Sequence, residues 1–304
     1  MQQGRPSRTA LAVAALRAAH QLMDVPVIFA DPVALPILGP EAEARIRADE
    51  ARLHAPPARF LRAALVARSR FAEDALAAAV ARGVDQYVVL GAGLDTFAYR
   101  NPHSGLRVIE VDHPATQTWK RGMLAAAGIA PPASVTFAPV DFERDTLADG
   151  LARAGFDGNR PAFVAWLGVT VYLTRDAILD TLRRVAALAP GSGIVFDYGL
   201  PPDRLTESQR VAFQAMADRA AAEGEPWRSF FTPDALLADL RGLGFCAVED
   251  VGSAELNPCY FSGRADGLAL GGISRLAHAT ITGGGSGNGS LRPEGKAPSR
   301  TVHA

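Results

Sequence analysis

The chain has 304 residues, with 31 basic and 32 acidic side chains, a formal net charge of −1 and 48% hydrophobic residues. These values are typical of a soluble globular protein and provide no bulk positive charge for binding nucleic acid. The cysteines, Cys246 and Cys259, are too few for a disulfide framework or a zinc cluster and fit a reducing cytoplasm. No apolar run is long enough to span a bilayer. We therefore expect a cytoplasmic protein without a metal, a nucleic-acid partner or a membrane partner.

Two helical patterns precede the first predicted strand. Ser7 can cap a helix from about Arg8 to Leu22, and an apolar stripe predicts a long helix over Arg59–Arg82. Between these patterns, the prolines of Val25–Pro40 exclude one regular helix, so this segment is predicted to be a loop with short turns.

From residue 86 onward, strand and helix patterns alternate along the chain. The predicted strands are Gln86–Leu90, Arg107–Val111, Val135–Val140, Ala162–Leu167, Gly193–Tyr198, Phe245–Val251 and Ile273–Thr280. The helical patterns among them cover about Pro114–Ala127, Leu147–Ala154, Arg175–Ala189, Thr206–Ala222 and Pro233–Leu243. This alternation predicts a doubly wound α/β fold, with a seven-stranded, mostly parallel sheet and helices on both faces.

These patterns divide the chain into three regions. Residues 1–58 are predicted to form an N-terminal helical region that belongs to the same domain as residues 59–280, which contain the sheet. Residues 281–304 are rich in glycine and serine and then carry proline, lysine and arginine. Such a composition cannot bury a core, so this region is predicted to be a disordered tail.

A glycine turn and the start of a helix follow the first predicted strand. Gly91, Ala92 and Gly93 form the turn, and Asp112 ends the second strand. Glycines let a ligand approach the backbone, and an acid about 20 residues on can bind two ribose hydroxyls. The pattern predicts a nucleoside pocket, although an ordinary strand-to-helix turn remains the alternative. Asp112 is a better candidate than Glu110 for the acid that binds the ribose, because it lies at the strand end where ligands bind.

The third glycine of the dinucleotide fingerprint is absent, because Thr96 stands at its position. A bound pyrophosphate needs bare amides and a close helix, whereas S-adenosylmethionine (SAM) carries no phosphate. The turn therefore favours SAM over NAD.

Arg68 lies on the apolar stripe of the predicted Arg59–Arg82 helix, between Leu65 and Phe71. A buried arginine must be paired. Arg68 is therefore a snorkelling side chain, a partner in a structural salt bridge, or the group that holds the carboxylate of SAM. Arg70 falls off the stripe and is predicted to be solvated.

Residues after the third and fourth predicted strands extend the candidate site. Asp141 can accept a hydrogen bond from an adenine amino group while Phe142 covers the ring, although Asp141 is also a suitable helix or turn cap. Gly168 permits a turn beside the sulfonium, and Trp166 and Tyr172 either line the pocket or pack in the core.

Together these motifs resemble the leucine carboxyl methyltransferase-like family of class I SAM-dependent methyltransferases, in its bacterial O-methyltransferase branch. The resemblance is carried mainly by Leu90-Gly-Ala-Gly-Leu-Asp-Thr96, Glu110-Val-Asp-His-Pro114 and Gly168-Val-Thr-Val-Tyr-Leu-Thr174. It covers roughly residues 5–280. It implies that the N-terminal helices form a lid over the substrate site.

The resemblance also implies roles for individual residues. Arg68 matches the arginine that holds the SAM carboxylate, Asp112 the ribose acid, and Asp141 and Phe142 the pair at the adenine. Leu167 is a departure, because the family commonly has a glutamate there, near the methionine amino group. Either the backbone carbonyl serves alone or the affinity is lower. The predicted cofactor-binding residues are Arg68, Gly91, Ala92, Gly93, Asp112, His113, Asp141, Phe142, Leu167 and Gly168.

The sequence thus predicts a SAM-dependent methyltransferase that modifies a hydroxyl or carboxylate of a small molecule, as a monomer or homodimer. The alternatives are a non-catalytic SAM-binding scaffold and an NAD-dependent oxidoreductase. A base assists transfer to a hydroxyl, whereas a carboxylate acceptor needs none. No catalytic base is assigned; the candidates are His54, His113, Asp197, Tyr198 and Tyr260.

Overall fold

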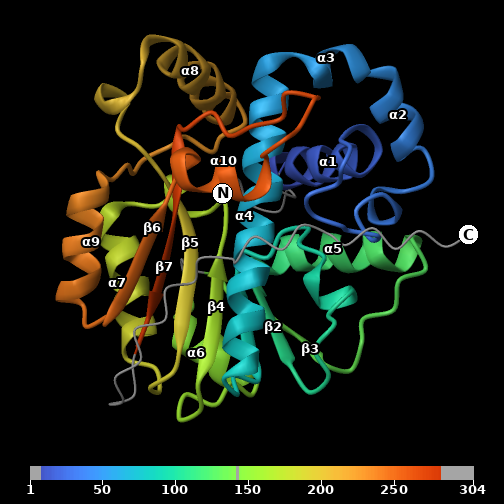
Figure 1. Cartoon of the computed structure of the whole chain (residues 1–304). Coiled ribbons are helices and arrows are strands. Elements are labelled where there is room, and N and C mark those ends of the chain that lie inside the picture. The colour runs from blue at the N-terminus through green and yellow to red at the C-terminus, as the bar shows by residue number, and fades with distance from the viewer. Residues whose placement is uncertain (1–7, 142–143, 282–304) are drawn as a thin grey trace, which may run out of the picture.

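A central sheet of seven strands organises the computed structural model, which describes residues 8–141 and 144–281 (Figure 1). The strands are β1 (Gln86–Leu90), β2 (Arg107–Asp112), β3 (Val135–Pro139), β4 (Ala162–Trp166), β5 (Gly193–Gly199), β6 (Ala247–Val251) and β7 (Ser274–Thr280). Their order is β3-β2-β1-β4-β5-β7-β6. Strands β1 to β5 pair in parallel, and β7 is antiparallel to both of its neighbours. The predicted doubly wound, mostly parallel sheet is confirmed.

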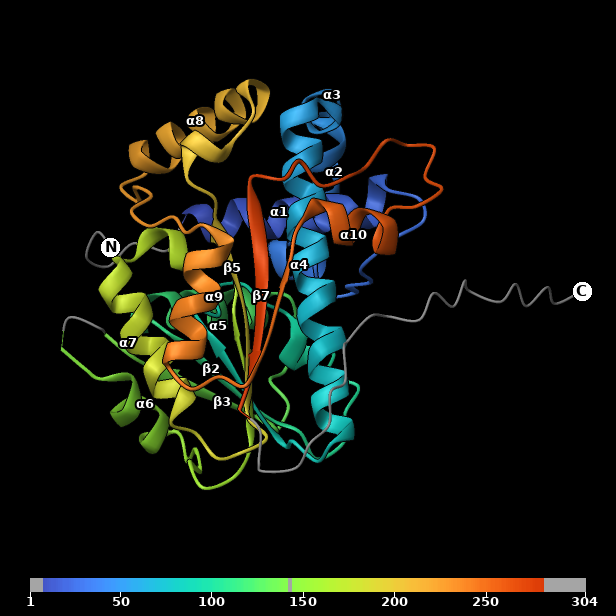
Figure 2. The ribbon, with the colours of Figure 1, turned by 60° about the vertical axis from the view of Figure 1, so that its left-hand side comes forward.

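Helices cover both faces of the sheet because the side chains of a strand point alternately to either face. On one face, Val88 and Leu90 of β1 belong to a core that includes side chains of α6 (Leu147–Arg153), α7 (Arg175–Ala186) and α9 (Pro233–Gly242). On the other face, Tyr87 and Val89 pack with α4 (Pro56–Ala81) and α10 (Ser253–Tyr260). Figure 2 shows these two layers on opposite sides of the sheet.

The remaining helices lie mostly at the end of the sheet where the parallel strands finish. They are α1 (Arg8–Met23), α2 (Ala42–Ala48), α3 (Glu50–His54) and α8 (Glu207–Ala222) (Figure 1). Helix α5 (Pro114–Ala126) follows β2 and packs against β3 and the N-terminal segment. None of the helices in the part of the chain that the structure describes is long and apolar enough to cross a membrane.

The structure differs from the sequence prediction in its short helices. Helices α2, α3 and α10 have 7, 5 and 8 residues and were not predicted. Helices this short are not stable alone and depend on tertiary packing, which a local pattern does not reveal. The helix expected after the glycine turn was wrong, because only one 3₁₀ turn, Phe97–Tyr99, forms there. Pro102 follows closely and disfavours helical backbone at the preceding residue.

Candidate functional site

The candidate residues lie in a row along the carboxyl ends of four adjacent parallel strands. Asp141 follows β3, Asp112 ends β2, Gly91 follows β1 and Gly168 follows β4, and these strands are neighbours in that order. Ligands of open α/β sheets bind at this edge, where the connections diverge. The fold therefore brings together four of the segments that the sequence singled out.

The glycine turn after β1 requires glycine for two reasons. Gly91 and Gly93 have positive φ angles of 66° and 44°, which other residues rarely adopt. A Cβ on Gly91 would overlap Cγ2 of Val169, and a Cβ on Gly93 would lie 3.4 Å from the Cβ of Ala10 in α1. The turn is consequently packed between the segment after β4 and the first turn of α1.

Asp112 is held at the end of β2 by backbone amides. Its Oδ2 accepts a hydrogen bond from the Gly93 amide at 2.6 Å, and its Oδ1 accepts one from the His113 amide at 2.7 Å. Burial raises the pKa of Asp112, and these two amides oppose that effect. The amides of Gly91 and Ala92 donate to the Val111 carbonyl, which fixes the turn beside this carboxylate.

His113 and Glu110, which lie close to Asp112 in the chain, both make structural contacts. His113 caps α5, and its Nδ1 accepts a hydrogen bond from the Ala115 amide at 3.2 Å. Glu110 is buried against Lys120, with 2.7 Å between Oε2 and Nζ, and its carboxylate accepts a hydrogen bond from the Tyr99 hydroxyl at 3.2 Å. The choice of Asp112 over Glu110 as the accessible acid agrees with this arrangement.

Arg68 forms a salt bridge with an aspartate that follows it by 129 residues. Its Nη1 lies 2.9 Å from Oδ2 of Asp197 in β5. The other oxygen, Oδ1, accepts a hydrogen bond from the Gly168 amide at 2.5 Å. A Cβ on Gly168 would lie 2.6 Å from Nη2 of Arg68, so the guanidinium lies against this glycine. Arg70 is exposed and pairs with Asp74, as expected for a solvated side chain.

The other predicted site residues occupy varied surroundings. Leu167 is partly buried and packs against the core beneath α4. Asp141 lies in a turn in which its carbonyl accepts hydrogen bonds from the amides of Arg144 and Asp145. Phe142 and the proposed cap Ser7 lie outside the described residues.

Thr96, at the position of the missing third glycine, joins the N-terminal segment to the glycine turn. Its hydroxyl is buried and donates to Oδ2 of Asp31 at 2.6 Å. Arg17 of α1 lies 2.8 Å from the same Asp31 oxygen and donates to the Leu94 carbonyl at 2.6 Å. Sequence reasoning missed Asp31 and Arg17, although an arginine within the apolar pattern of α1 was an available signal. Because Thr96 is engaged and no α-helix begins here, the turn is unsuited to a pyrophosphate.

Three of the five candidate bases, Tyr198, Tyr260 and His54, contact side chains outside the row. The Tyr198 hydroxyl donates to Asp250 at 2.6 Å and the Tyr260 hydroxyl donates to Asp74 at 3.0 Å, and burial raises the pKa of both phenols. His54 is exposed beside Glu50. Trp166 packs in the core, with its ring centroid 6.4 Å from that of Phe196, which is the second of its two predicted alternatives.

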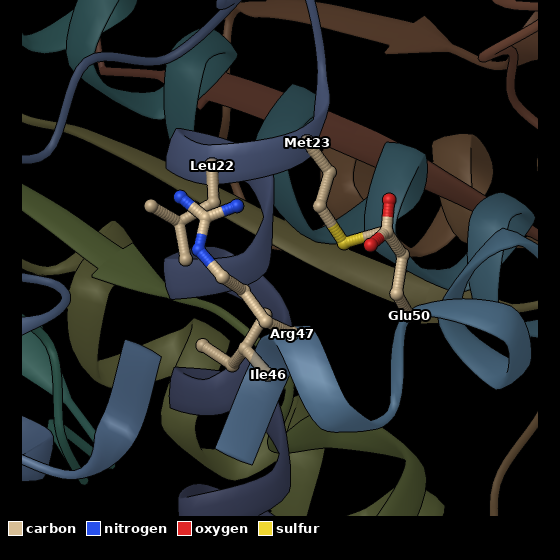
Figure 3. Close-up of a pocket in the computed structure, with 5 residues that line it drawn as sticks. All are labelled: Leu22, Met23, Ile46, Arg47 and Glu50. Carbon is tan, nitrogen blue, oxygen red and sulfur yellow. The ribbon is translucent and has the colours of Figure 1, made fainter. Parts of the chain in front are cut away.

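Two cavities lie among the N-terminal helices. The smaller, about 20 Å³, is lined by Leu22, Met23, Ile46, Arg47 and Glu50, and the Met23 thioether points toward Glu50 (Figure 3). The larger, about 510 Å³, lies among α1, α2, α3 and α5 and is lined largely by apolar side chains, including Leu11, Trp119 and Met123. Neither is lined by a predicted cofactor-binding residue. In residues 8–141 and 144–281, no cluster of His, Cys, Asp and Glu could hold a metal ion.

Comparison with known proteins decides the family. The family model described as leucine carboxyl methyltransferase matches residues 10–186. The chain belongs to the leucine carboxyl methyltransferase family. This agrees with the resemblance found in its motifs, and the match spans every segment of the row described above.

Relatives of this leucine carboxyl methyltransferase family member are named as SAM-dependent methyltransferases. The Bacillus subtilis protein YktD is 32% identical over 292 residues, which are 88% of this chain and 96% of YktD. A Frankia alni protein is 36% identical over 248 residues, which are 79% of this chain and 82% of that protein. The protein is therefore a SAM-dependent methyltransferase, and the NAD-dependent interpretation is dropped.

A solved structure confirms the fold. A Thermobifida fusca protein described as a methyltransferase superposes with a TM-score of 0.54 at 20% sequence identity. The match covers 93% of this chain and 97% of that chain. The sheet order and the helices on both faces are consistent with the class I methyltransferase fold.

Proposed function

We propose that the row at the carboxyl edge binds SAM, and that the enzyme transfers its methyl group to an oxygen of a small apolar molecule. The residues present fit the cofactor. The glycine turn offers backbone without side chains, Asp112 offers a carboxylate held in place by two amides, and Arg68 offers a cation. SAM supplies a methyl group that its sulfonium already activates.

The order of the strands, together with the family resemblance, supports the following proposed positions for the parts of the cofactor. Asp141 and Phe142 would contact the adenine, and Asp112 the ribose hydroxyls. The turn Gly91-Ala92-Gly93 would lie beneath the nucleoside, with His113 beside it. Arg68, Leu167 and Gly168 would surround the methionine part.

An aromatic cluster above the ends of β4 and β5 is the observation that carries the proposed acceptor class. Tyr172 lies in the 3₁₀ helix Thr170–Tyr172 directly after Gly168, where it interacts with Thr9 and Trp227. The Phe213 ring lies 5.1 Å from that of Trp227 and 5.3 Å from that of Phe230. These uncharged side chains suit a small apolar or aromatic acceptor better than a nucleic acid or a basic peptide.

The contacts of the candidate bases favour a carboxylate acceptor. The Tyr198 hydroxyl donates to Asp250, the Tyr260 hydroxyl donates to Asp74, and the Asp197 carboxylate pairs with Arg68. A carboxylate acceptor needs no base, whereas a hydroxyl acceptor does. The chain's main contribution is then to hold the acceptor oxygen in line with the methyl group, which can supply about 7–11 kcal/mol. The description of the family also refers to a carboxyl group.

Labelled methyl transfer tests this proposal. The enzyme would be incubated with methyl-labelled SAM and a panel of small aryl and alkyl carboxylates, phenols and amines. We expect label in products that release methanol in alkali, as methyl esters do. Label in alkali-stable ethers would identify a hydroxyl acceptor, and label on amines would contradict O-methylation. SAM binding without transfer to any member of the panel would contradict the proposed acceptor class.

The N-terminal residues 1–58 are proposed to act as a lid over this site. The described part places Ala10 against the glycine turn and Arg17 on the Leu94 carbonyl, so α1 lies directly over residues 91–94. Acceptor access would then require α1 to move or the acceptor to enter beside the aromatic cluster.

A further inference from the structure

We propose that Asp197 is a cofactor-binding residue that holds the α-ammonium group of SAM while Arg68 holds the α-carboxylate. The inference rests on the proposed SAM site and extends it. It gives a binding role to a carboxylate that the family motifs do not mark, on the strand next to Gly168.

The position of Asp197 places it at the methionine end of the row. It lies in β5, the neighbour of β4, and its Oδ1 accepts the Gly168 amide at 2.5 Å. Its Oδ2 lies 2.9 Å from Nη1 of Arg68. Thr170 donates its hydroxyl to the Asp197 carbonyl at 2.6 Å and fixes the backbone. The carboxylate is thus built into the turn that borders the methionine part.

The Arg68–Asp197 pair is more accessible than the buried Arg62–Asp24 pair. The side chains of Arg68 and Asp197 are 17% and 15% exposed, whereas those of Arg62 and Asp24 are 1% and 4% exposed. Arg62 binds Asp24 through two nitrogens, at 2.7 and 2.8 Å. Arg68 donates only Nη1 to Asp197, which leaves guanidinium hydrogens for another acceptor.

The charges of the pair complement an amino acid. An α-amino acid carries one ammonium and one carboxylate, and Arg68 and Asp197 carry the opposite charges. When the ligand binds, its carboxylate can replace Asp197 as the partner of Arg68, and its ammonium group can replace Arg68 as the partner of Asp197. Every buried charge then stays paired, which avoids the large cost of an uncompensated charge. An arginine alone would hold the carboxylate and leave the ammonium without an anionic partner.

The two residues directly beside Gly168 in the chain carry no anion. Leu167 and Val169 are apolar and pack against the two cores. In residues 8–141 and 144–281, no other carboxylate is hydrogen-bonded or paired with Arg68 or Gly168. Asp112 ends β2, which is two strands away from β4 in the sheet order. Asp197 is therefore the anion that this part of the row offers to an ammonium group.

The test compares two ligands by calorimetry. S-adenosylhomocysteine carries the amino acid group, whereas 5′-methylthioadenosine has the same nucleoside and thioether without it. We expect Asp197→Asn to weaken S-adenosylhomocysteine binding at least tenfold and to change 5′-methylthioadenosine binding less than twofold. An equal change for both ligands, or no change for either, would overturn the proposal.

Asp250→Asn is the matched control for Asp197→Asn. Asp250 is also a strand aspartate that pairs with an arginine, with 2.7 Å between its Oδ2 and Nε of Arg275, and its side chain is 9% exposed. Loss of this pair is expected to lower stability and leave the preference for S-adenosylhomocysteine over 5′-methylthioadenosine unchanged. If the control lost that preference as well, the effect at Asp197 would be structural and the proposal wrong.

A second variant keeps the proposal testable if Asp197→Asn does not fold. Arg68→Ala leaves Asp197 without its cation, so an S-adenosylhomocysteine analogue with hydrogen in place of its carboxyl group should bind at least threefold more tightly than to the wild type. Unchanged or weaker binding of this amine would contradict contact with Asp197. Failure of the wild type to bind either adenosyl ligand would instead overturn the proposed cofactor site itself.

Discussion

At the scale of single residues, Asp112 shows how one carboxylate can serve both the fold and a ligand. Its two oxygens accept the amides of Gly93 and His113 and so hold the glycine turn against the end of β2. An ionised carboxylate has about four lone-pair sites, so ribose hydroxyls can bind to the remaining ones. The same geometry therefore keeps the turn in place and orients the acid.

Replacing Asp112 by alanine is expected to weaken S-adenosylhomocysteine binding at least tenfold, a loss of about 1.4 kcal/mol. The reason is that a charge-assisted hydrogen bond to a hydroxyl contributes about 1.5–3 kcal/mol. Calorimetry measures the affinity, and thermal unfolding shows whether the variant is folded. Asp85→Ala is the control, because Asp85 directly precedes β1 and so lies at the amino ends of the parallel strands, opposite the candidate site. Unchanged affinity in a folded Asp112→Ala protein would remove this residue from the site.

Arg68 shows what a pattern does and does not reveal at this scale. Its place on an apolar stripe predicted that it must have a partner. The partner, Asp197, is 129 residues away and was known from the sequence only as a candidate base at a strand end. Local periodicity determines which face of a helix a side chain occupies, but the partner across the sheet depends on strand order.

At the scale of elements, the glycine turn combines a local and a tertiary requirement. The positive φ angle of Gly91 is a local feature, and the glycine motif in the sequence predicts it. The close approach of Val169, from the segment after β4, depends on the pairing of β1 with β4. A Cβ atom at Gly91 would therefore meet both a strained backbone and the Val169 side chain. This glycine is harder to replace than its backbone conformation alone would suggest.

Gly91→Ala is expected to destabilise the protein by about 2–4 kcal/mol, from backbone strain and overpacking against Val169. Gly122→Ala is the contrasting variant, because a Cβ there would meet nothing within 4 Å and Gly122 lies inside α5. It should stabilise by about 0.5–1 kcal/mol. Urea unfolding measures both. Equal effects of the two substitutions would contradict both the backbone strain and the overpacking at Gly91.

The short helices illustrate the limit of element prediction. Helices α2 and α3 bury Ile46 and Leu53, respectively, in a small core shared with α1 and α4. Such helices form because the rest of the molecule offers an apolar surface. Their own sequence carries too few turns for a clear period of 3.6 residues.

At the scale of the whole molecule, buried polar groups join the N-terminal segment to the sheet domain. Arg62 of α4 binds Asp24 through two nitrogens, and His20 Nδ1 lies 2.8 Å from the same carboxylate. His20 Nε2 accepts the amides of Ile28 and Phe29, so Nδ1 is the protonated nitrogen that donates to Asp24. The segment after α1 is thereby fixed to α4.

The stability of the protein is expected to fall in acid because of Asp24. Burial raises the pKa of this carboxyl, but the hydrogen bonds from His20 and Arg62 outweigh burial and lower it from 3.8 to about 2. A lowered pKa stabilises the fold above pH 4, and this contribution of about 2 kcal/mol is lost as the pH falls toward 2. Urea unfolding of wild type and Asp24→Asn should show a stability difference that shrinks over that range. A constant difference would contradict the proposed titration.

Arg62→Met is expected to destabilise the protein by about 3–5 kcal/mol, because it leaves the buried Asp24 carboxylate without its cation. Arg45→Met is the comparison, since Arg45 and Glu41 form an ion pair with exposed side chains. Exposed pairs contribute at most about 1 kcal/mol. Similar losses in the two variants, measured by urea unfolding, would argue against a special role for the buried pair.

The sequence by itself determined the alternation of strands and helices, the glycine turn and the family. These features are local: a strand has a period of two, a helix one of 3.6, and a positive φ angle requires glycine. The tertiary structure alone decided that Arg68 pairs with Asp197, that Thr96 binds Asp31 and that aromatic rings cover the ends of β4 and β5. Those contacts join distant segments, and strand order and packing, rather than any local pattern, bring them within bonding distance.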